Sequence, residues 1–165
     1  MKKLAIQNLI LDDFDVENKI QRIGLEILED NTDESKITLF GISNNGKLIA
    51  EKLVSYINKI SDIETVLIEV VIENGAPEYT GKLNILDESI IIVGDVSQTG
   101  KTLQIVISNL MMHEPSKIKT SVIINRDQTM YPVKIDYVGL SLSTSVNEHV
   151  DVMVDEKNRF SVYLS

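Results

Sequence analysis

The stretch Ile90-Ile-Ile-Val-Gly-Asp-Val-Ser-Gln-Thr-Gly-Lys-Thr102 decides the fold of this chain and much of its chemistry. Its apolar start predicts a buried core strand, and the polar segment after it leads into an apolar helix predicted over residues 103–112. Residues 99–102 would then present backbone N–H groups and two threonine hydroxyls at a helix N-terminus, where the helix dipole also favours negative charge. Gly100 would let the backbone approach a phosphate closely. The stretch therefore predicts an anion-binding loop between a strand and a helix.

Two other interpretations of this loop are open. Gly100-Lys101-Thr102 matches the end of the P-loop of nucleoside triphosphatases, but that motif has four residues between its glycines, and here five separate Gly94 from Gly100. The charge of Asp95 would also repel a phosphate chain inside such a cradle. The other alternative is a plain strand–turn–helix connection that binds nothing. We favour the anion site over both.

Strands and helices alternate on either side of this loop. The first helix has an apolar face with spacings of four, three and four residues: Val16, Ile20, Ile23 and Ile27. Acidic residues gather where this helix should begin: Asp12, Asp13 and Asp15. A break at Ser43-Asn-Asn-Gly46 then separates a strand predicted over residues 37–42 from a second helix. The apolar face predicted for that helix is formed by Ile49, Leu53, Tyr56 and Ile60.

Further strands are predicted over residues 65–72, which we expect to be buried on both faces, and over 119–124, 136–142, 150–154 and 160–164. Residues 73–88 contain two glycines and a proline and predict a mobile excursion or a hairpin. The alternation indicates right-handed βαβ units and a mainly parallel, Rossmann-like α/β fold, with one domain over residues 1–165. Ligands bind beyond the carboxyl ends of the strands in such sheets, where both the 43–46 and the 94–102 segments would lie.

The composition narrows the class of protein. The chain of 165 residues is 43% hydrophobic, has a net charge of -9 and contains no cysteine and two histidines. No apolar run reaches the length of about 20 residues that a membrane span needs, and polar residues soon follow Met1-Lys2-Lys3. We therefore expect a cytoplasmic protein with no signal peptide, membrane contact or disulfide. The negative charge disfavours broad binding to RNA or DNA, and two distant histidines disfavour a histidine-rich metal site.

The loop resembles the signature of type I phosphoribosyltransferases, which is an apolar strand, an acidic pair, a few variable residues and Thr-Gly-x-Thr, here Thr99-Gly-Lys-Thr102. The resemblance extends over nearly the whole chain and is strongest to the PyrR-like branch, pyrimidine operon regulators that are also uracil phosphoribosyltransferases. It is carried by the following segments: Ile20-Gln-Arg-Ile-Gly-Leu-Glu-Ile-Leu28, Gly41-Ile-Ser-Asn-Asn-Gly46, Ile124-Asn-Arg-Asp127, Pro132, Asp136-Tyr-Val-Gly139, Thr144-Ser145 and Glu148.

This resemblance implies Mg²⁺-dependent transfer of a phosphoribosyl group from phosphoribosyl pyrophosphate to a nucleobase, a pyrimidine such as uracil or a purine, with release of pyrophosphate. Asp95 would be the catalytic residue and would bind the ribose and, directly or through water, the metal. The 5-phosphate would be bound by Thr99, Gly100, Lys101 and Thr102, and Val96, Ser97 and Gln98 would complete the substrate-binding loop. The pyrophosphate would face Asn44, Asn45 and Gly46, and the base pocket would be lined by Arg126 and residues 136–140. Because relatives are dimers or tetramers, a homodimer or homotetramer is expected.

Departures from the family pattern concentrate at this same site. Gly94 replaces the first acid of the pair, and Asn44 and Asn45 stand where the family has a basic, hydroxyl-bearing run, with Lys47 as a partial substitute. The hood segment 73–79 lacks the family's arginine and acidic pair, which leaves Tyr79 as a cap or as an ordinary surface tyrosine. Gln98 stands where purine-specific relatives keep an acid, so it cannot act as a general base. The alternative that follows is a degenerate regulatory relative that binds a nucleotide or phosphoribosyl pyrophosphate without turnover.

Overall fold

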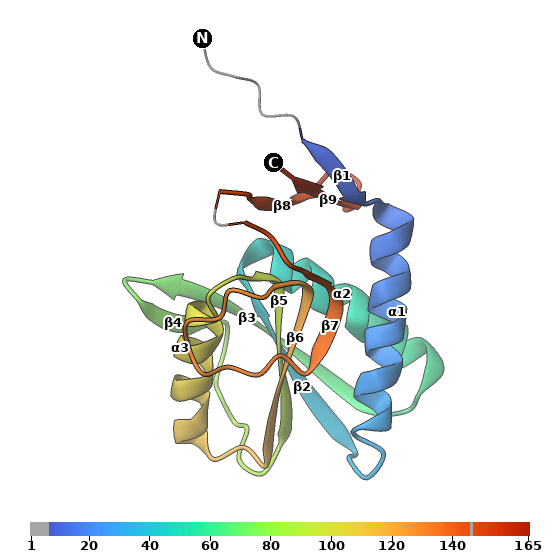
Figure 1. Cartoon of the computed structure of the whole chain (residues 1–165). Coiled ribbons are helices and arrows are strands. Elements are labelled where there is room, and N and C mark those ends of the chain that lie inside the picture. Colours follow the sequence, from blue (N-terminus) through green and yellow to red (C-terminus); the bar gives the residue numbers. More distant parts are fainter. Residues whose placement is uncertain (1–6, 146) are drawn as a thin grey trace.

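The computed structural model describes residues 7–145 and 147–165, which form two β-sheets and three α-helices (Figure 1). Residues 1–6, which bear on the expected absence of a signal peptide, and Val146 lie outside this description. The main sheet has the strand order β4-β3-β2-β5-β6-β7. Its strands are β2 (Lys36–Ile42), β3 (Glu64–Glu73), β4 (Ala76–Tyr79), β5 (Ser89–Ser97), β6 (Lys117–Arg126) and β7 (Tyr137–Leu142). Every neighbouring pair is parallel except β3 and β4, so the predicted α/β fold is confirmed.

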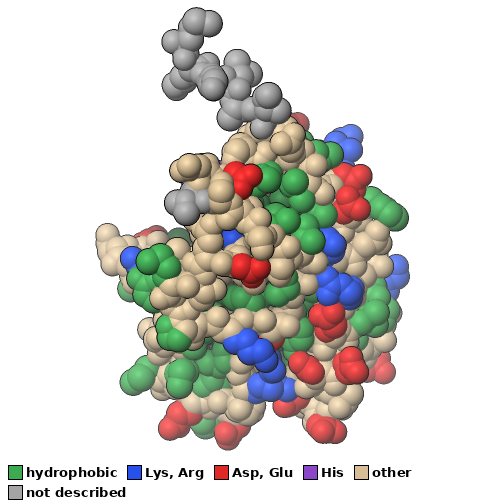
Figure 2. All heavy atoms as spheres, in the orientation of Figure 1, with side chains coloured by type: hydrophobic (Ala, Val, Ile, Leu, Met, Phe, Trp, Pro, Cys, Tyr) green, Lys and Arg blue, Asp and Glu red, His purple; other side chains and the backbone are tan. Residues whose placement is uncertain are grey.

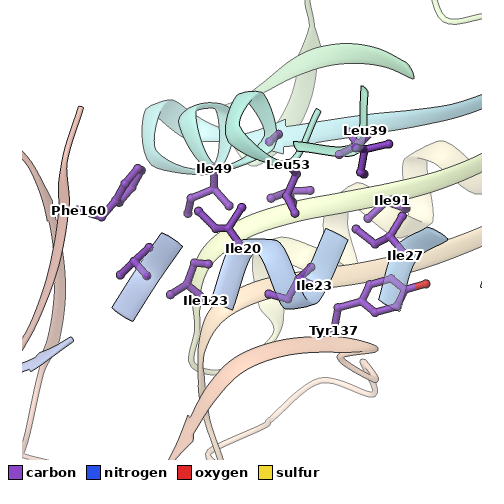
Figure 3. Close-up of a cluster of buried hydrophobic side chains, with 14 of the residues drawn as sticks. Ile20, Ile23, Ile27, Leu39, Ile49, Leu53, Ile91, Ile123, Tyr137 and Phe160 are labelled. Atoms are coloured by element: carbon purple, nitrogen blue, oxygen red, sulfur yellow. The ribbon is translucent and has the colours of Figure 1, made fainter. Parts of the chain in front are cut away.

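Side chains that alternate between the two faces of this sheet build two hydrophobic cores. On one face Ile91 and Val93 pack with helices α1 (Asp13–Glu29) and α2 (Ser43–Ile60). On the other face Ile90 and Ile92 pack with helix α3 (Lys101–Leu110), which is followed by a short 3-10 helix η1 (Met111–His113). Figure 3 shows the first core, in which α1 contributes a row of isoleucines. Among the described helices, none is long and apolar enough to cross a membrane.

Helix α1 follows its prediction closely. The four apolar residues of the predicted face are each at most 1% exposed: Val16, Ile20, Ile23 and Ile27. The acidic residues at its start form a capping box, in which the Asp15 N–H donates to Oδ1 of Asp12 (2.9 Å) and the Asp12 N–H donates to Oδ2 of Asp15 (3.1 Å). The local sequence thus determines both where this helix begins and which face it buries.

Helix α2 begins earlier than predicted. Ser43 already belongs to it, so the segment 43–46 is the first turn of the helix and not a separate loop. Two glycines permit this direct connection, because they let the helix lie against neighbouring backbone. A Cβ on Gly41 would lie 2.6 Å from the Cα of Lys47, and one on Gly46 would lie 2.6 Å from the carbonyl oxygen of Val93.

The buried face of α2 also differs from the prediction. Ile49 and Leu53 are buried as expected, but the row continues to Ile57, which is fully buried, while Ile60 is 44% exposed. Tyr56 is half-buried beside Gly24 of α1, where a Cβ would lie 2.7 Å from the tyrosine ring. Residues four apart therefore form the contact with the sheet, and the last turn of the helix extends past it.

Strands β3 and β5 differ from their predictions in burial and in length. In the segment 65–72, which we expected to be buried on both faces, only Ile68 and Val70 are buried. The other residues are less covered because the outer edge of β3 pairs with the short strand β4. Strands β3 and β4 form the expected hairpin, with the left-handed pair Asn74 and Gly75 (φ 51° and 79°) at its turn. Strand β5 continues beyond the predicted end at residue 93, because its pairing with β6 extends to Ser97, so the loop before α3 is shorter than predicted.

A second, three-stranded antiparallel sheet has the order β1-β9-β8, built from β1 (Asn8–Leu11), β8 (Val150–Val154) and β9 (Phe160–Leu164). It lies beyond the carboxyl edge of the main sheet (Figure 1). Phe160 and Val162 of β9 join the core that α1 and α2 share, and the Phe160 N–H donates to Oδ1 of Asp13 (2.8 Å). Strands β8 and β9 have the predicted bounds, whereas β1 was not predicted.

Candidate functional site

The two central strands β2 and β5 are followed by helices on opposite faces of the sheet. Helix α2 packs on the face that holds Leu39 and Ile91, and α3 on the face that holds Phe40 and Ile92. Although β2 and β5 are paired side by side, the chain leaves their carboxyl ends toward opposite faces of the sheet. This is the topological switch point at which parallel α/β sheets bind ligands. The topology alone therefore predicts a ligand site at the starts of α2 and α3.

The turn before α3 borders a small hollow. Residues 96–103 line a cavity of about 260 Å³, and Gly100 at the helix N-cap adopts a left-handed conformation with φ 81°. The Thr99 hydroxyl accepts a hydrogen bond from the Lys101 N–H (3.3 Å). Gly100 provides no side-chain cap, and within the described residues Thr99 engages only the Lys101 N–H, so the N–H groups of Thr102 and Leu103 are available to an anion. The turn thus has the geometry of an anion site.

A neighbouring segment holds this turn in shape. The N–H groups of Met130 and Tyr131 both donate to the carbonyl oxygen of Thr99, at 2.9 and 3.1 Å. Val133 approaches from the same side, since a Cβ built on Gly100 would lie 3.5 Å from the Val133 Cβ. The loop after β6 therefore supports the turn from behind, which the sequence did not reveal.

Asp95 and Asn45, which are 50 residues apart in the chain, meet in the crevice between β5 and α2. The Asn45 Nδ2 group donates to Oδ2 of Asp95 (2.9 Å), and the Val96 N–H donates to Oδ1 of Asp95 (2.7 Å). The same Nδ2 group donates to the carbonyl oxygen of Val152 in β8 (3.1 Å). The structure therefore joins two segments that the sequence placed at the site separately, and adds the second sheet as a third contributor.

Gly94 and Asp95 both line a second cavity, which lies beside the phosphate turn. This cavity measures about 350 Å³, and most of its lining side chains are aliphatic. They are Ile42, Val71, Ile72, Val96, Leu103 and Val122, with Ser43, Asp95 and Thr102 as the polar contributors. A Cβ on Gly94 would point to Val122, whose Cγ1 lies 3.6 Å away, so the backbone here has room for a side chain.

The comparisons with known proteins agree with this geometry. Residues 8–157 match the model of the phosphoribosyl transferase domain. The chain belongs to the phosphoribosyl transferase family. It is 28% identical to the bifunctional protein PyrR of Streptococcus pneumoniae over 155 residues, which cover 89% of this chain and 90% of that protein.

Solved structures of the family share the fold. A hypoxanthine-guanine phosphoribosyltransferase from Bacillus anthracis is 18% identical and superimposes with a TM-score of 0.78, covering 98% of this chain and 100% of that one. The hypoxanthine phosphoribosyltransferase of Trypanosoma cruzi is 15% identical with a TM-score of 0.79, covering 94% and 95%. At these identities the likeness concerns the fold.

The start of α2 stands where the family resemblance places the pyrophosphate loop. Within the described chain no side chain caps this helix, and its first residue, Ser43, has a φ of 60°. Two helix N-termini therefore approach the same edge, and both favour negative charge. Lys47 does not add to this charge, because its Nζ pairs with Oε2 of Glu69 on β3 at 3.1 Å. Asn44 is exposed at the same turn.

Arg126, which we expected to line the base pocket, makes its hydrogen bonds to residues 144–148. It is 2% exposed, and its guanidinium holds the segment that leads to β8. Its Nε donates to the Thr144 hydroxyl (2.8 Å), and its NH2 group donates to the carbonyl oxygens of Glu148 (2.8 Å) and Ser145 (3.3 Å). A buried guanidinium committed to these acceptors anchors the segment before β8 and has these donors occupied within the chain.

The expected contribution of residue 136 to the base pocket is also corrected. Asp136 precedes β7 and so lies at the amino edge of the main sheet, where it accepts hydrogen bonds from the Thr120 N–H (3.1 Å) and from Lys119 (3.3 Å). It lines a larger hollow of about 690 Å³ between α3 and the loop 132–136. The lysines there are paired with acids, among them Lys134 with Asp136 at 3.4 Å, and charges of both signs are interspersed on this face (Figure 2). The lysines of this hollow are therefore partly neutralised by the acids with which they pair.

Tyr79 is neither a cap over the site nor an ordinary surface tyrosine. Its hydroxyl donates to Oδ1 of Asn109 on α3 (2.8 Å), and its ring meets that of Phe40 edge to face with centroids 5.8 Å apart. Burial raises the pKa of Tyr79 to about 12. The residue fastens the β3–β4 hairpin to α3 and so fixes one wall of the 350 Å³ cavity.

The described residues contain no cluster of three metal-ligating side chains. Among the described residues, Asp95 is the one carboxylate that lines the 350 Å³ cavity. Mg²⁺ keeps several waters and often binds through one or two carboxylates together with substrate phosphates. The site therefore fits a metal ion that arrives with a phosphorylated ligand, and does not fit a resident one.

Proposed function

We propose that this phosphoribosyl transferase family protein binds a 5-phosphorylated ribose compound, with the 5-phosphate on the turn of residues 97–102 and the ribose hydroxyls on Asp95. The observation that carries the proposal is the pairing of an uncapped helix N-terminus at Gly100 with a carboxylate on the preceding strand. N–H groups and hydroxyls donate to a phosphate, whereas a carboxylate accepts from hydroxyls. The two halves of the site thus suit the two ends of a ribose 5-phosphate.

The first candidate activity is transfer of the phosphoribosyl group from phosphoribosyl pyrophosphate to a nucleobase, with release of pyrophosphate. The chain's own contribution would be positioning, because the turn and Asp95 would hold the sugar at both ends while the bond to the diphosphate breaks. The N-terminus of α2 would stabilise the negative charge of the leaving group. Mg²⁺ bound with the substrate would neutralise part of the same charge, and Asp95 would hold its water shell.

The second candidate is a regulatory protein that binds a nucleotide or phosphoribosyl pyrophosphate without turnover. A specific observation favours it: the cationic and acidic groups of the site are reduced or engaged elsewhere. Gly94 provides no second carboxylate, and Lys47 is paired with Glu69. Electrostatic stabilisation is usually the largest catalytic contribution, so its loss lowers turnover more than binding.

One experiment separates the two candidates. The protein is incubated with Mg²⁺, phosphoribosyl pyrophosphate and each nucleobase in turn, and released pyrophosphate is measured. The variant Asp95→Asn removes the charge of the ribose contact, and Asp33→Asn, an exposed aspartate before the amino end of β2, is the matched control.

Pyrophosphate release that Asp95→Asn abolishes and Asp33→Asn preserves would establish the transferase and name its base. Saturable binding of ribose 5-phosphate without pyrophosphate release for any base would establish the binding protein. Absence of both would refute the proposed ligand class.

A further inference from the structure

The side-chain amide of Asn45 lies between three parts of the molecule. Asn45 is the third residue of α2, and its Nδ2 group donates both to Oδ2 of Asp95 on β5 (2.9 Å) and to the carbonyl oxygen of Val152 on β8 (3.1 Å). Both partners are acceptors only, so a flipped amide would place its oxygen against two other oxygens. The NH2 orientation is therefore determined by its surroundings, and both of its hydrogens are used.

The hydrogen bonds around Asp95 leave a specific part of its carboxylate available. An ionised carboxylate has about four lone-pair sites, two on each oxygen. Asn45 occupies one site on Oδ2, and the Val96 N–H occupies one on Oδ1 (2.7 Å). One acceptor site thus remains on each oxygen, which matches two hydroxyl donors on adjacent carbons.

We propose that Asn45 is a positioning residue that locks the Asp95 carboxylate for the adjacent 2- and 3-hydroxyls of a ribose, and thereby makes the site select ribose ligands over 2-deoxyribose ligands. This inference rests on the proposed function and adds to it the origin of sugar specificity. Asn45 does not touch the sugar. It acts by holding Asp95, and its contact with Val152 holds Asn45 in turn.

The selection follows from the single carboxylate. With Gly94 in place of a second acid, Asp95 alone accepts the hydroxyls, so its rotation about the side-chain torsions decides how many of them it can accept at once. Fixed by Asn45 and Val96, it accepts two. Without the hydrogen bond from Asn45, the carboxylate can turn to accept a single hydroxyl in its best geometry. A 2-deoxy sugar then loses less binding free energy relative to ribose.

The test compares the affinities of ribose 5-phosphate and 2-deoxyribose 5-phosphate by isothermal titration calorimetry of the full chain. The ratio of the two dissociation constants cancels the phosphate contribution that both ligands share. We expect a preference of about ten- to a hundredfold for the ribose compound in the wild type, the range for one hydrogen bond to a charged group. In Asn45→Ala we expect the ratio to fall to about threefold or less, which is under half of that free-energy difference.

Two further variants keep the result interpretable. Asn45→Leu retains the approximate volume without the donor, and decides the matter if Asn45→Ala fails to fold. Asn58→Ala removes an exposed side-chain hydrogen bond, to Thr65, at the opposite end of the same helix and should leave the ratio unchanged.

Loss of sugar selection in the folded Asn45 variants, with the Asn58 variant unaffected, would support the inference. A wild type without ribose preference, or a folded Asn45 variant that keeps it, would overturn the inference while leaving the phosphate site standing. If neither sugar phosphate binds the wild type, it is the proposed function that fails.

Discussion

The substitution Gly100→Ala separates the backbone requirement of the phosphate turn from its contact with a ligand. Gly100 has a φ of 81°, a left-handed conformation that costs a residue with a Cβ about 1–2 kcal/mol. The added methyl would have room, because its closest neighbours are the Val133 Cβ at 3.5 Å and the Tyr131 oxygen at 3.6 Å. The cost of the substitution is therefore the backbone strain alone, and we expect the free energy of unfolding to fall by about 1 kcal/mol.

Gly75 provides a matched control. It has a φ of 79° and nothing within 4 Å of its Cβ position, but it lies in the β3–β4 turn, away from the phosphate hollow. Gly75→Ala should therefore cost the same stability, within about 0.5 kcal/mol, as judged by urea denaturation. Only Gly100→Ala should weaken ribose 5-phosphate binding, by about tenfold or more, because relief of the backbone strain would displace the N–H groups that meet the phosphate. Equal affinities of the two variants would refute the assignment of Gly100 to the phosphate turn.

Three further predictions test the core, the hairpin contact and the missing acid. Ile57→Ala should lower the free energy of unfolding by about 2–5 kcal/mol and Ile60→Ala by no more than about 0.5 kcal/mol, as measured by urea denaturation, since the first side chain is buried and the second exposed; the reverse order would contradict the observed face of α2. Because burial raises the pKa of Tyr79 to about 12, the unfolded chain loses that proton first, so stability should fall as the pH rises from about 10 to about 12. Tyr79→Phe should reduce this slope without abolishing it, because burial and the Asp30 carboxylate raise the pKa of Tyr137 in the same direction; an unchanged slope would exclude the Tyr79 contribution. Gly94→Asp introduces a second acid at a position where the Cβ has room. It should strengthen Mg²⁺-dependent binding of phosphoribosyl pyrophosphate by about tenfold, as measured by calorimetry. No gain in affinity would show that Gly94 is not the position of the missing ligand.

Local periodicity was sufficient to predict those elements whose sequence and environment agree. In α1, Ile20 and Ile23 belong to a row of apolar residues that repeats from one turn to the next. The capping box, which joins Asp12 and Asp15, marks the start of the helix. Strands β8 and β9 were predicted with their full bounds for the same reason, because turn-forming residues enclose them.

The start of α2 shows where local reasoning fails. Ser43, Asn44 and Gly46 are residues typical of loops, and their polarity hides the fact that a helix begins directly at the end of β2. What permits the helix is a close approach of backbones at Gly41 and Gly46, and the neighbour of Gly46 is Val93, in a strand distant in sequence. The rotation of the buried face toward Ile57 has the same origin.

The site itself was predictable in its parts and not in its connections. The phosphate turn and Asp95 are contiguous in sequence, so their chemistry could be inferred from residue types and spacing. The hydrogen bond from Asn45 to Asp95 spans 50 residues, and the one from Asn45 to Val152 spans 107. Arg126 was assigned to the base pocket on the family resemblance, whereas tertiary contacts use it to anchor the segment before β8. No sequence signal distinguishes these two uses of a buried arginine.

The most direct test of the central claim is a titration of the ¹⁵N-labelled protein with ribose 5-phosphate, followed by the backbone amide resonances. We predict saturable shifts that are largest for residues 99–103, where the uncapped first turn of α3 would receive the phosphate, with smaller shifts at Asp95 and Asn45. Shifts that instead concentrate in the larger hollow beside α3, around Lys119 and Lys134, or that do not saturate, would contradict the claim that the residue 97–102 turn is the phosphate site.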